Sequence, residues 1–271
     1  MRKTINSFDG IKISYDIERH GKYFLVFLHG AGGNLTAWRK ERDFFHKKGL
    51  STIAIDLRGH GRSGRPVSAQ GYELEKFAKD VDVVLGKERV RHFIIVGHCF
   101  GGMVTIMFHK LFPQNAKAYI LVDTTYAASG LIKSLTHHPF LMHIANRLLK
   151  HMPTNKASDV DFSKIVGTSD INLGRIYSDI LSTSLKSWLF TYEAVSKFRG
   201  IHILKSIRKP VLIIHGGKDT IFDIYEAKKI NRLVKGSRLE VVPNANHVIV
   251  LNNPRTLSRD IYEFVISLNM N

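Results

Sequence analysis

Short β-prone runs of apolar residues alternate along the chain with longer segments of helical pattern. The apolar runs lie at residues 23–28, 51–55, 93–96, 119–122, 210–214 and 238–242. An earlier run, residues 11–17, alternates apolar and polar positions and reads as a half-buried strand. Continuous apolar strands separated by helices predict a parallel sheet covered on both faces, which is an α/β architecture. Ligand sites of such sheets lie at the carboxyl ends of the strands, so the chemistry is sought there.

One long interval breaks this alternation. Between Asp123 and Pro210 no strong strand signal occurs, and residues 126–200 have a helical pattern, for example at 140–149 and 185–190. Loops of this length are rarely structureless in compact proteins. We therefore expect a core formed by residues 1–125 and 201–271, with residues 126–200 inserted as a helical cap after the sixth strand. Trp188, together with Phe190 and Tyr192, is expected to line the substrate pocket or fill the core of this cap.

Residues 97–102, Gly-His-Cys-Phe-Gly-Gly, join an apolar strand to an apolar helix. A strand that passes through a glycine-flanked turn into a helix is typical of a nucleophile elbow, which exposes its central residue at the top of a sheet. The flanking glycines allow strand and helix to approach closely. The central residue is Cys99, the only cysteine of the chain. The context favours a nucleophile over a buried structural thiol, the usual role of a lone cysteine.

A cysteine nucleophile needs a base, an acid that orients the base, and donors for the oxyanion. In the fold that this elbow implies, the acid and the histidine follow the nucleophile along the chain. Asp219 lies just past the run at 210–214, and His247 lies just past the last strand. Asp219 could instead be a turn residue, and Asp123, after the sixth strand, is the alternative acid. We favour Asp219 because it follows two glycines at a strand end.

These motifs resemble those of the α/β-hydrolase superfamily, in its branch of small capped hydrolases. The elbow and the Asp219 and His247 loops match, as do residues 29–33 (His-Gly-Ala-Gly-Gly), similar to an oxyanion loop, and residues 56–63, similar to the turn after the fourth strand. The resemblance implies a doubly wound, mostly parallel sheet of eight strands with a helical cap. It also implies that the backbone N–H groups of Ala31 and Phe100 form the oxyanion hole.

Several polar residues near these motifs are expected to have structural roles. His29 and His98 flank the site and are expected to pack or orient loops at the edge of the substrate pocket. The turn after the fourth strand contains Asp56, Arg58 and His60, which are expected to hold it together. The predicted cap contains four histidines, at positions 137, 138, 143 and 151, but lacks the defined spacing of a metal site. No metal and no cofactor are expected.

The departure from the family pattern is a cysteine where serine is usual. A thiolate attacks esters, lactones and thioesters readily, but it is also a good leaving group, so attack on an amide tends to reverse. The sequence therefore predicts a hydrolase for a carboxylic ester, lactone or thioester that works through an acyl-cysteine and the triad Cys99, His247 and Asp219. An acyltransferase with the same intermediate and a non-catalytic ligand-binding homologue are the alternatives. Which acyl substrate is used stays open.

Composition adds limits on partners and location. The chain has 271 residues, of which 44% are hydrophobic, and a formal net charge of +17. Such a charge would suit an anionic partner, but the basic residues are spread along the chain, which favours a solvated surface without nucleic acid binding. No signal peptide or membrane-spanning run is seen, and a lone cysteine is compatible with the cytoplasm. The expected partner is a small-molecule acyl substrate, and the oligomeric state stays open.

Overall fold

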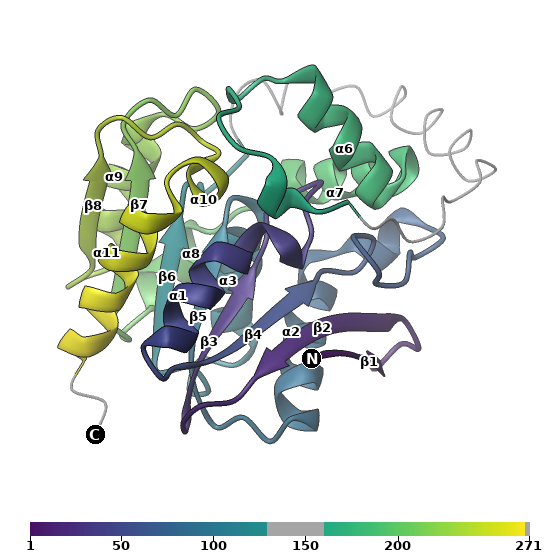
Figure 1. The fold of residues 1–271 in the computed structure, drawn as a ribbon, viewed down its shortest axis with the longest axis horizontal. Coiled ribbons are helices and arrows are strands. Elements are labelled where there is room, and N and C mark those ends of the chain that lie inside the picture. Colours follow the sequence, from purple (N-terminus) through teal and green to yellow (C-terminus); the bar gives the residue numbers. More distant parts are fainter. Residues whose placement is uncertain (129–159, 269–271) are drawn as a thin grey trace.

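A single eight-stranded sheet forms the centre of the computed structural model, which describes residues 1–128 and 160–268 (Figure 1). The strand order is β1-β2-β4-β3-β5-β6-β7-β8. The strands are β1 (Arg2–Asn6), β2 (Lys12–Glu18), β3 (Tyr23–Leu28), β4 (Ser51–Asp56), β5 (His92–His98), β6 (Ala118–Val122), β7 (Val211–Gly216) and β8 (Arg238–Val242). Strand β2 runs antiparallel to β1 and β4, whereas every pairing from β4 through β8 is parallel. The predicted mostly parallel, eight-stranded sheet is confirmed.

Every strand predicted from an apolar or alternating run is present, with ends that differ by one or two residues. Strand β1 was not foreseen, because its five residues contain a single strongly apolar side chain, Ile5. It is an edge strand paired only with β2, and most of its side chains are exposed or half-buried. An edge strand that faces water needs little apolar pattern, so it escapes a search for hydrophobic periodicity.

Helices cover both faces of the sheet. The helical elements are η1 (Leu35–Trp38), α1 (Arg39–Lys47), η2 (Ala69–Tyr72), α2 (Leu74–Lys87), α3 (Phe100–Leu111), η3 (Phe162–Lys164), α6 (Leu173–Thr183), α7 (Leu185–Lys197), α8 (Ile201–Ser206), α9 (Ile224–Leu233), α10 (Ile249–Asn252) and α11 (Pro254–Ser267). Alternate residues of β3 belong to different cores. Val26 and Leu28 share one core with α2, α3, α8 and α9, whereas Leu25 and Phe27 share the other with α1 and α11.

Helices α6 and α7 belong to the segment between β6 and β7 and lie beyond one end of the sheet (Figure 1). The described part of that segment is helical, as its sequence pattern predicts. The division into core and cap remains a prediction. The predicted helix at 140–149 and the four cap histidines lie outside the described residues. In the parts of the chain that are described, no helix is long and apolar enough to cross a membrane.

The turn after β4 is held by buried charges, as expected. Asp56 is fully buried and accepts the backbone N–H groups of Leu35 and Arg62 at 2.8 and 3.0 Å. Arg58, also fully buried, makes two hydrogen bonds to Asp80, at 2.7 and 2.6 Å. A bidentate pair of this kind satisfies both charges and fixes the geometry. The turn thus anchors the loop that follows β4 and, through Leu35, the segment that follows the predicted oxyanion loop.

Candidate active site

Cys99 occupies a strained turn between β5 and α3. Its backbone has φ 51° and ψ −112°, in the left-handed half of the map that residues other than glycine seldom adopt. The turn is fixed on both sides, because the Cys99 N–H donates to the Val122 carbonyl at 2.9 Å and the Thr124 hydroxyl donates to the Cys99 carbonyl at 2.7 Å. This is the backbone geometry of a nucleophile elbow.

Two glycines make this close approach of strand and helix possible. A Cβ at Gly97 would lie 2.3 Å from the Gly101 carbonyl oxygen, and a Cβ at Gly101 would lie 2.3 Å from the Leu28 carbonyl oxygen. Real side chains do not tolerate backbone contacts of this length. The glycines that the sequence placed around Cys99 are therefore required by packing.

His247 and Asp219 lie beside the elbow, on loops that follow β8 and β7. The Nδ1 atom of His247 is 2.8 Å from Oδ2 of Asp219, and the Cys99 side chain is close enough to raise the pKa of His247. The other Asp219 oxygen accepts the backbone N–H groups of Ile221 and Phe222 at 2.8 and 2.9 Å. Asp219 is thus both a turn residue and the carboxylate that orients the imidazole, so the two interpretations of its sequence position are compatible.

Asp123, the alternative acid, makes different contacts. It is fully buried, and its Oδ1 accepts the Gly216 N–H at 2.7 Å, while its Oδ2 has no hydrogen-bond partner among the described residues. Burial raises the pKa of Asp123 well above the usual range, which disfavours its charged form. The geometry favours Asp219 as the partner of His247.

The charges of the site stabilise one another. Burial alone would lower the pKa of His247, but the neighbouring Cys99 and the Asp219 carboxylate outweigh it and hold that pKa well above the usual value. Burial would likewise raise the pKa of Asp219, yet its hydrogen bond to His247 and its backbone donors keep it below the usual range. Both shifts favour a protonated imidazole at His247 beside an ionised Asp219 carboxylate.

The two residues predicted to supply oxyanion donors line the same pocket as Cys99. Helix α3 begins at Phe100, and Ala31 lies in the loop after β3; both residues line the pocket with Cys99. Neither N–H has a hydrogen-bond acceptor among the described residues. A Cβ at Gly30 would meet the Cys99 Cβ at 3.3 Å, so this loop lies directly against the elbow. The Phe100 N–H, at the N-terminus of α3, suits a developing negative charge, and the Ala31 N–H is the second candidate donor.

The pocket at Cys99 has a volume of about 110 Å³ within the described residues. Its apolar wall is formed by Met103, Tyr192, Val195, Ile221, Phe222 and Val248. Trp188 is not among the residues that line it; its ring packs 4.4 Å from that of Tyr192 and so supports the wall from behind. Phe190 is buried in the main core.

The two flanking histidines orient loops. His29 is buried, contacts the Gly30 carbonyl through Nδ1 at 2.8 Å and accepts the Leu57 N–H through Nε2 at 3.1 Å; burial lowers its pKa to about 4. His98 Nε2 lies 2.9 Å from the His247 carbonyl, and burial together with the charge of His247 lowers its pKa to about 3. Both rings are neutral and line a pocket of about 50 Å³ beside the elbow.

Asp170, which the sequence analysis did not single out, joins the two loops that bear the acid and the histidine. It is buried, and its Oδ1 accepts the His247 backbone N–H at 2.8 Å. Its Oδ2 accepts the backbone N–H and the hydroxyl of Thr220 at 2.8 and 2.7 Å. Asp170 belongs to a segment without a recognisable motif, so no sequence signal pointed to it.

Arg175 of α6, also missed, places a cation at the pocket. It lines the pockets at both Cys99 and Ala31, and its Nε is buried without a hydrogen-bond partner among the described residues. One Nη is 3.3 Å from Asp179, a carboxyl whose pKa burial raises to about 7. Asp179 in turn packs against Gly32, where a Cβ would lie 2.6 Å away. Near neutral pH this pair leaves Arg175 only partly neutralised.

Two groups of potential metal ligands lie close to the site. His98, Asp123 and His247 form one, and Asp123, His215 and Asp219 form the other, each with ligand atoms within 4.8 Å. His247 of the first group and Asp219 of the second are already hydrogen-bonded to each other. These residues therefore fit a hydrogen-bonded catalytic pair better than a metal site.

The comparisons agree with this geometry. A family model of the alpha/beta hydrolase fold matches residues 23–160 and 173–254. Protein ABHD8 of Bos taurus is 23% identical over 248 residues, which cover 89% of this chain and 56% of that protein, so the chain spans about half the length of this relative. The AB hydrolase superfamily protein YisY of Bacillus subtilis is 26% identical over 247 residues, which cover 84% of this chain and 85% of that protein.

A solved structure, the esterase EaEST of Exiguobacterium antarcticum, superposes with a TM-score of 0.77 at 20% identity, covering 98% of this chain and 99% of that one. Similarity at this level of identity establishes the fold and not the reaction. Taken with the family match over most of its length, the elbow and the sheet order show that this chain belongs to the α/β-hydrolase family.

Proposed function

We propose that this protein is a hydrolase that cleaves a carboxylic ester, lactone or thioester through a covalent acyl-cysteine. The observation that carries the proposal is the position of Cys99, on a strained elbow beside the His247–Asp219 pair. The similar solved esterase supports acyl hydrolysis as the reaction class.

The contacts assign a role to each group. The Cys99 thiolate attacks the acyl carbon, and the carbonyl oxygen, now negative, accepts hydrogen bonds from the N–H groups of Ala31 and Phe100. Protonated His247 gives its proton to the leaving oxygen or sulfur as that bond breaks, which leaves a thioester on Cys99. A water molecule then gives a proton to His247 and attacks the thioester. Collapse releases the free acid and restores the thiolate and the imidazolium.

Asp219 keeps the imidazole in the required tautomer by accepting a hydrogen bond from Nδ1–H, so that Nε2 faces the reaction. His98 and Asp170 hold the His247 backbone at two successive peptide groups, His98 through the carbonyl and Asp170 through the N–H. Fixing the imidazole in this way contributes to catalysis because proton transfer depends on distance and direction.

Acyl transfer is the second candidate, and the identity of the nucleophile favours it. A thioester reacts well with amines and thiols, so an acceptor other than water would complete the same cycle. The division of the acyl group between water and an added acceptor distinguishes hydrolysis from acyl transfer. A product that remains the free acid across increasing concentrations of added thiol or amine indicates hydrolysis.

The decisive experiment is intact-mass spectrometry after mixing the protein with p-nitrophenyl acetate. We expect one acetyl adduct, absent in Cys99→Ala, together with loss of esterase activity in that variant. Because Cys99 is the only cysteine, the adduct needs no further mapping among thiols. His92→Ala, an exposed histidine at the start of β5, serves as a control that should retain both signals. Full activity in Cys99→Ala would overturn the proposal, and an unreactive wild-type protein would indicate a ligand-binding homologue.

A further inference from the structure

Two histidines and a glutamate converge on the molecular surface, away from Cys99. Glu18 ends β2, His20 lies in the turn that follows, and His46 lies in the last turn of α1. Glu18 pairs with Thr52, near the start of β4, whereas Cys99 follows the end of β5. Strand β4 is parallel to the strands that lead to the active site. The cluster therefore lies at the amino ends of the parallel strands, and the active site lies at their carboxyl ends.

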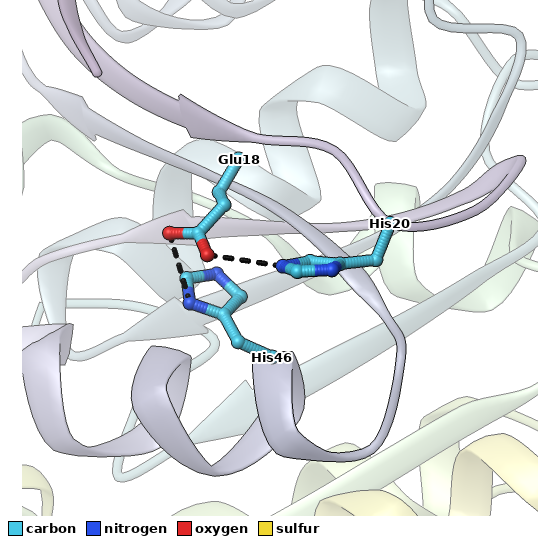
Figure 2. A group of neighbouring side chains, drawn as sticks. All are labelled: Glu18, His20 and His46. Carbon is cyan, nitrogen blue, oxygen red and sulfur yellow. Dashed lines mark hydrogen bonds and ion pairs between the residues drawn. The ribbon is translucent and has the colours of Figure 1, made fainter.

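The carboxylate of Glu18 faces both imidazoles, one with each oxygen (Figure 2). Oε1 is 3.0 Å from Nε2 of His20, and Oε2 is 3.0 Å from Nδ1 of His46. One ligand atom from each of the three residues lies within 4.8 Å of the others. A zinc ion with bonds of about 2.0–2.2 Å separates neighbouring ligand atoms by roughly 3–3.5 Å, so the carboxylate–imidazole spacing fits.

The second ring nitrogen of His46, Nε2, is held in a way that suits a metal ligand. Its Nε2 is 2.7 Å from the Thr52 hydroxyl oxygen, which is buried and also accepts Nε of Arg42 at 3.1 Å. An imidazole that donates its Nε2–H to Thr52 has its lone pair on Nδ1, which is the atom directed at Glu18. Histidines that ligate metals are oriented in this way by a second hydrogen bond.

Mobility and charge are also compatible with a cation. The side chains of Glu18 and His20 are 44% and 36% exposed, so they are free to rotate and close the remaining gap, while His46, at 13%, is held in place. Arg42 is the opposing charge, and it is paired with Asp16 at 3.4 Å. Asp43, next to it in α1, adds a further negative charge near His46.

We propose that Glu18, His20 and His46 form a binding site for a divalent transition-metal ion, with zinc as the best match to a two-histidine, one-carboxylate set. Three protein ligands leave one position for water. The bound ion would fasten the β2–β3 turn to the end of α1. It would act on stability and not on the chemistry of Cys99, because the two sites lie at opposite ends of the parallel strands. No metal was expected from the sequence, because the cap histidines lack the spacing of a metal site. Glu18, His20 and His46 were not considered, since they are separated by up to 28 positions and form no motif.

The test uses untagged full-length protein freed of metal with a chelator and titrated calorimetrically with zinc. We expect one equivalent to bind to wild type, with affinity reduced by more than about 100-fold in His20→Ala and Glu18→Gln, since removing a ligand should exceed the 10–100-fold effect of an outer-shell change. His92→Ala is the matched control and should bind as wild type does. Cobalt in place of zinc should give the strong visible absorption of a four-coordinate site.

Thermal unfolding supplies a second readout. Zinc at about 100 times its dissociation constant should raise the melting temperature of wild type by roughly 5–10 °C and leave His20→Ala unchanged. If wild type bound no zinc at micromolar concentration, the proposal would be refuted, and the two imidazoles and the carboxylate would form only a hydrogen-bonded cluster. Equal binding by wild type, His20→Ala and Glu18→Gln would refute it as well, because the metal would then lie elsewhere.

Discussion

Replacing Asp219 by asparagine tests the geometry of the proposed triad most directly. The side-chain oxygen of asparagine can keep the position of Oδ1, where the Ile221 and Phe222 N–H groups donate at 2.8 and 2.9 Å. The amide nitrogen then faces Nδ1 of His247, across the present 2.8 Å contact. An amide N–H needs an acceptor there, so the imidazole proton moves to Nε2, and His247 no longer takes a proton from Cys99 or water.

The loss should be large because nothing else in the described site replaces the carboxylate. A wrong tautomer in a triad lowers kcat by about 10⁴, and a lower limit of about 10³ here corresponds to roughly 4 kcal/mol of transition-state stabilisation. The assay is steady-state hydrolysis of p-nitrophenyl acetate, with circular dichroism to show that the variant is folded. We expect kcat to fall and KM to change little, since Asp219 does not touch the substrate.

Asp223→Asn is the matched control. Asp223 is exposed, lies four residues further along the same loop and caps α9 through the Tyr225 N–H at 2.9 Å, which asparagine does equally well. Its kcat should equal that of wild type. The reasoning is refuted if Asp219→Asn keeps kcat within tenfold of wild type, and a large loss in Asp123→Asn instead would transfer the role to the buried alternative.

The remaining predictions concern the residues around this pair. Arg175→Met should raise KM several-fold for esters that carry a carboxylate and leave p-nitrophenyl acetate unaffected; equal changes for both substrates would contradict a binding role. Asp170→Asn removes a charged acceptor from His247 and Thr220, so it should cost about 1.5–3 kcal/mol of unfolding free energy and about tenfold in kcat, measured by urea unfolding and initial rates. In pH-dependent unfolding, the raised pKa of His247 should contribute its full stability below about pH 6.5, and this contribution should be lost as pH rises through the pKa of His247 in the folded state. The lowered pKa of Asp219 should contribute stability that is lost only as pH falls below about 4. Cys99→Ser should reduce the alkaline loss.

The sequence carried enough information to bring Cys99, Asp219 and His247 together, because each follows a strand that its sequence predicts. In a parallel sheet the ends of such strands meet at one edge, so local pattern is sufficient to bring Cys99, Asp219 and His247 together. The strand β1 and the helix boundaries carry weaker patterns, and β1 was missed for this reason.

Asp170 and Arg175 could not be found in the same way. Their roles depend on tertiary contacts of the segment that contains α6 with the loops after β7 and β8. Contacts of this kind produce no periodic pattern in the sequence. The convergence of Glu18, His20 and His46 depends likewise on the register of β2 with β4 and on the length of α1. Such contacts between distant positions leave no local pattern.

The packing around the elbow has a consequence for how this lineage could change its chemistry. The strained backbone at residue 99 is accompanied by glycines at 97 and 101, where a Cβ would clash with neighbouring main-chain atoms, and none of these close approaches involves the sulfur. The scaffold is therefore indifferent to whether a thiol or a hydroxyl stands at the turn. Cysteine and serine codons differ by a single nucleotide, so under the proposed mechanism one substitution would exchange the nucleophile and leave the packing of the elbow unchanged.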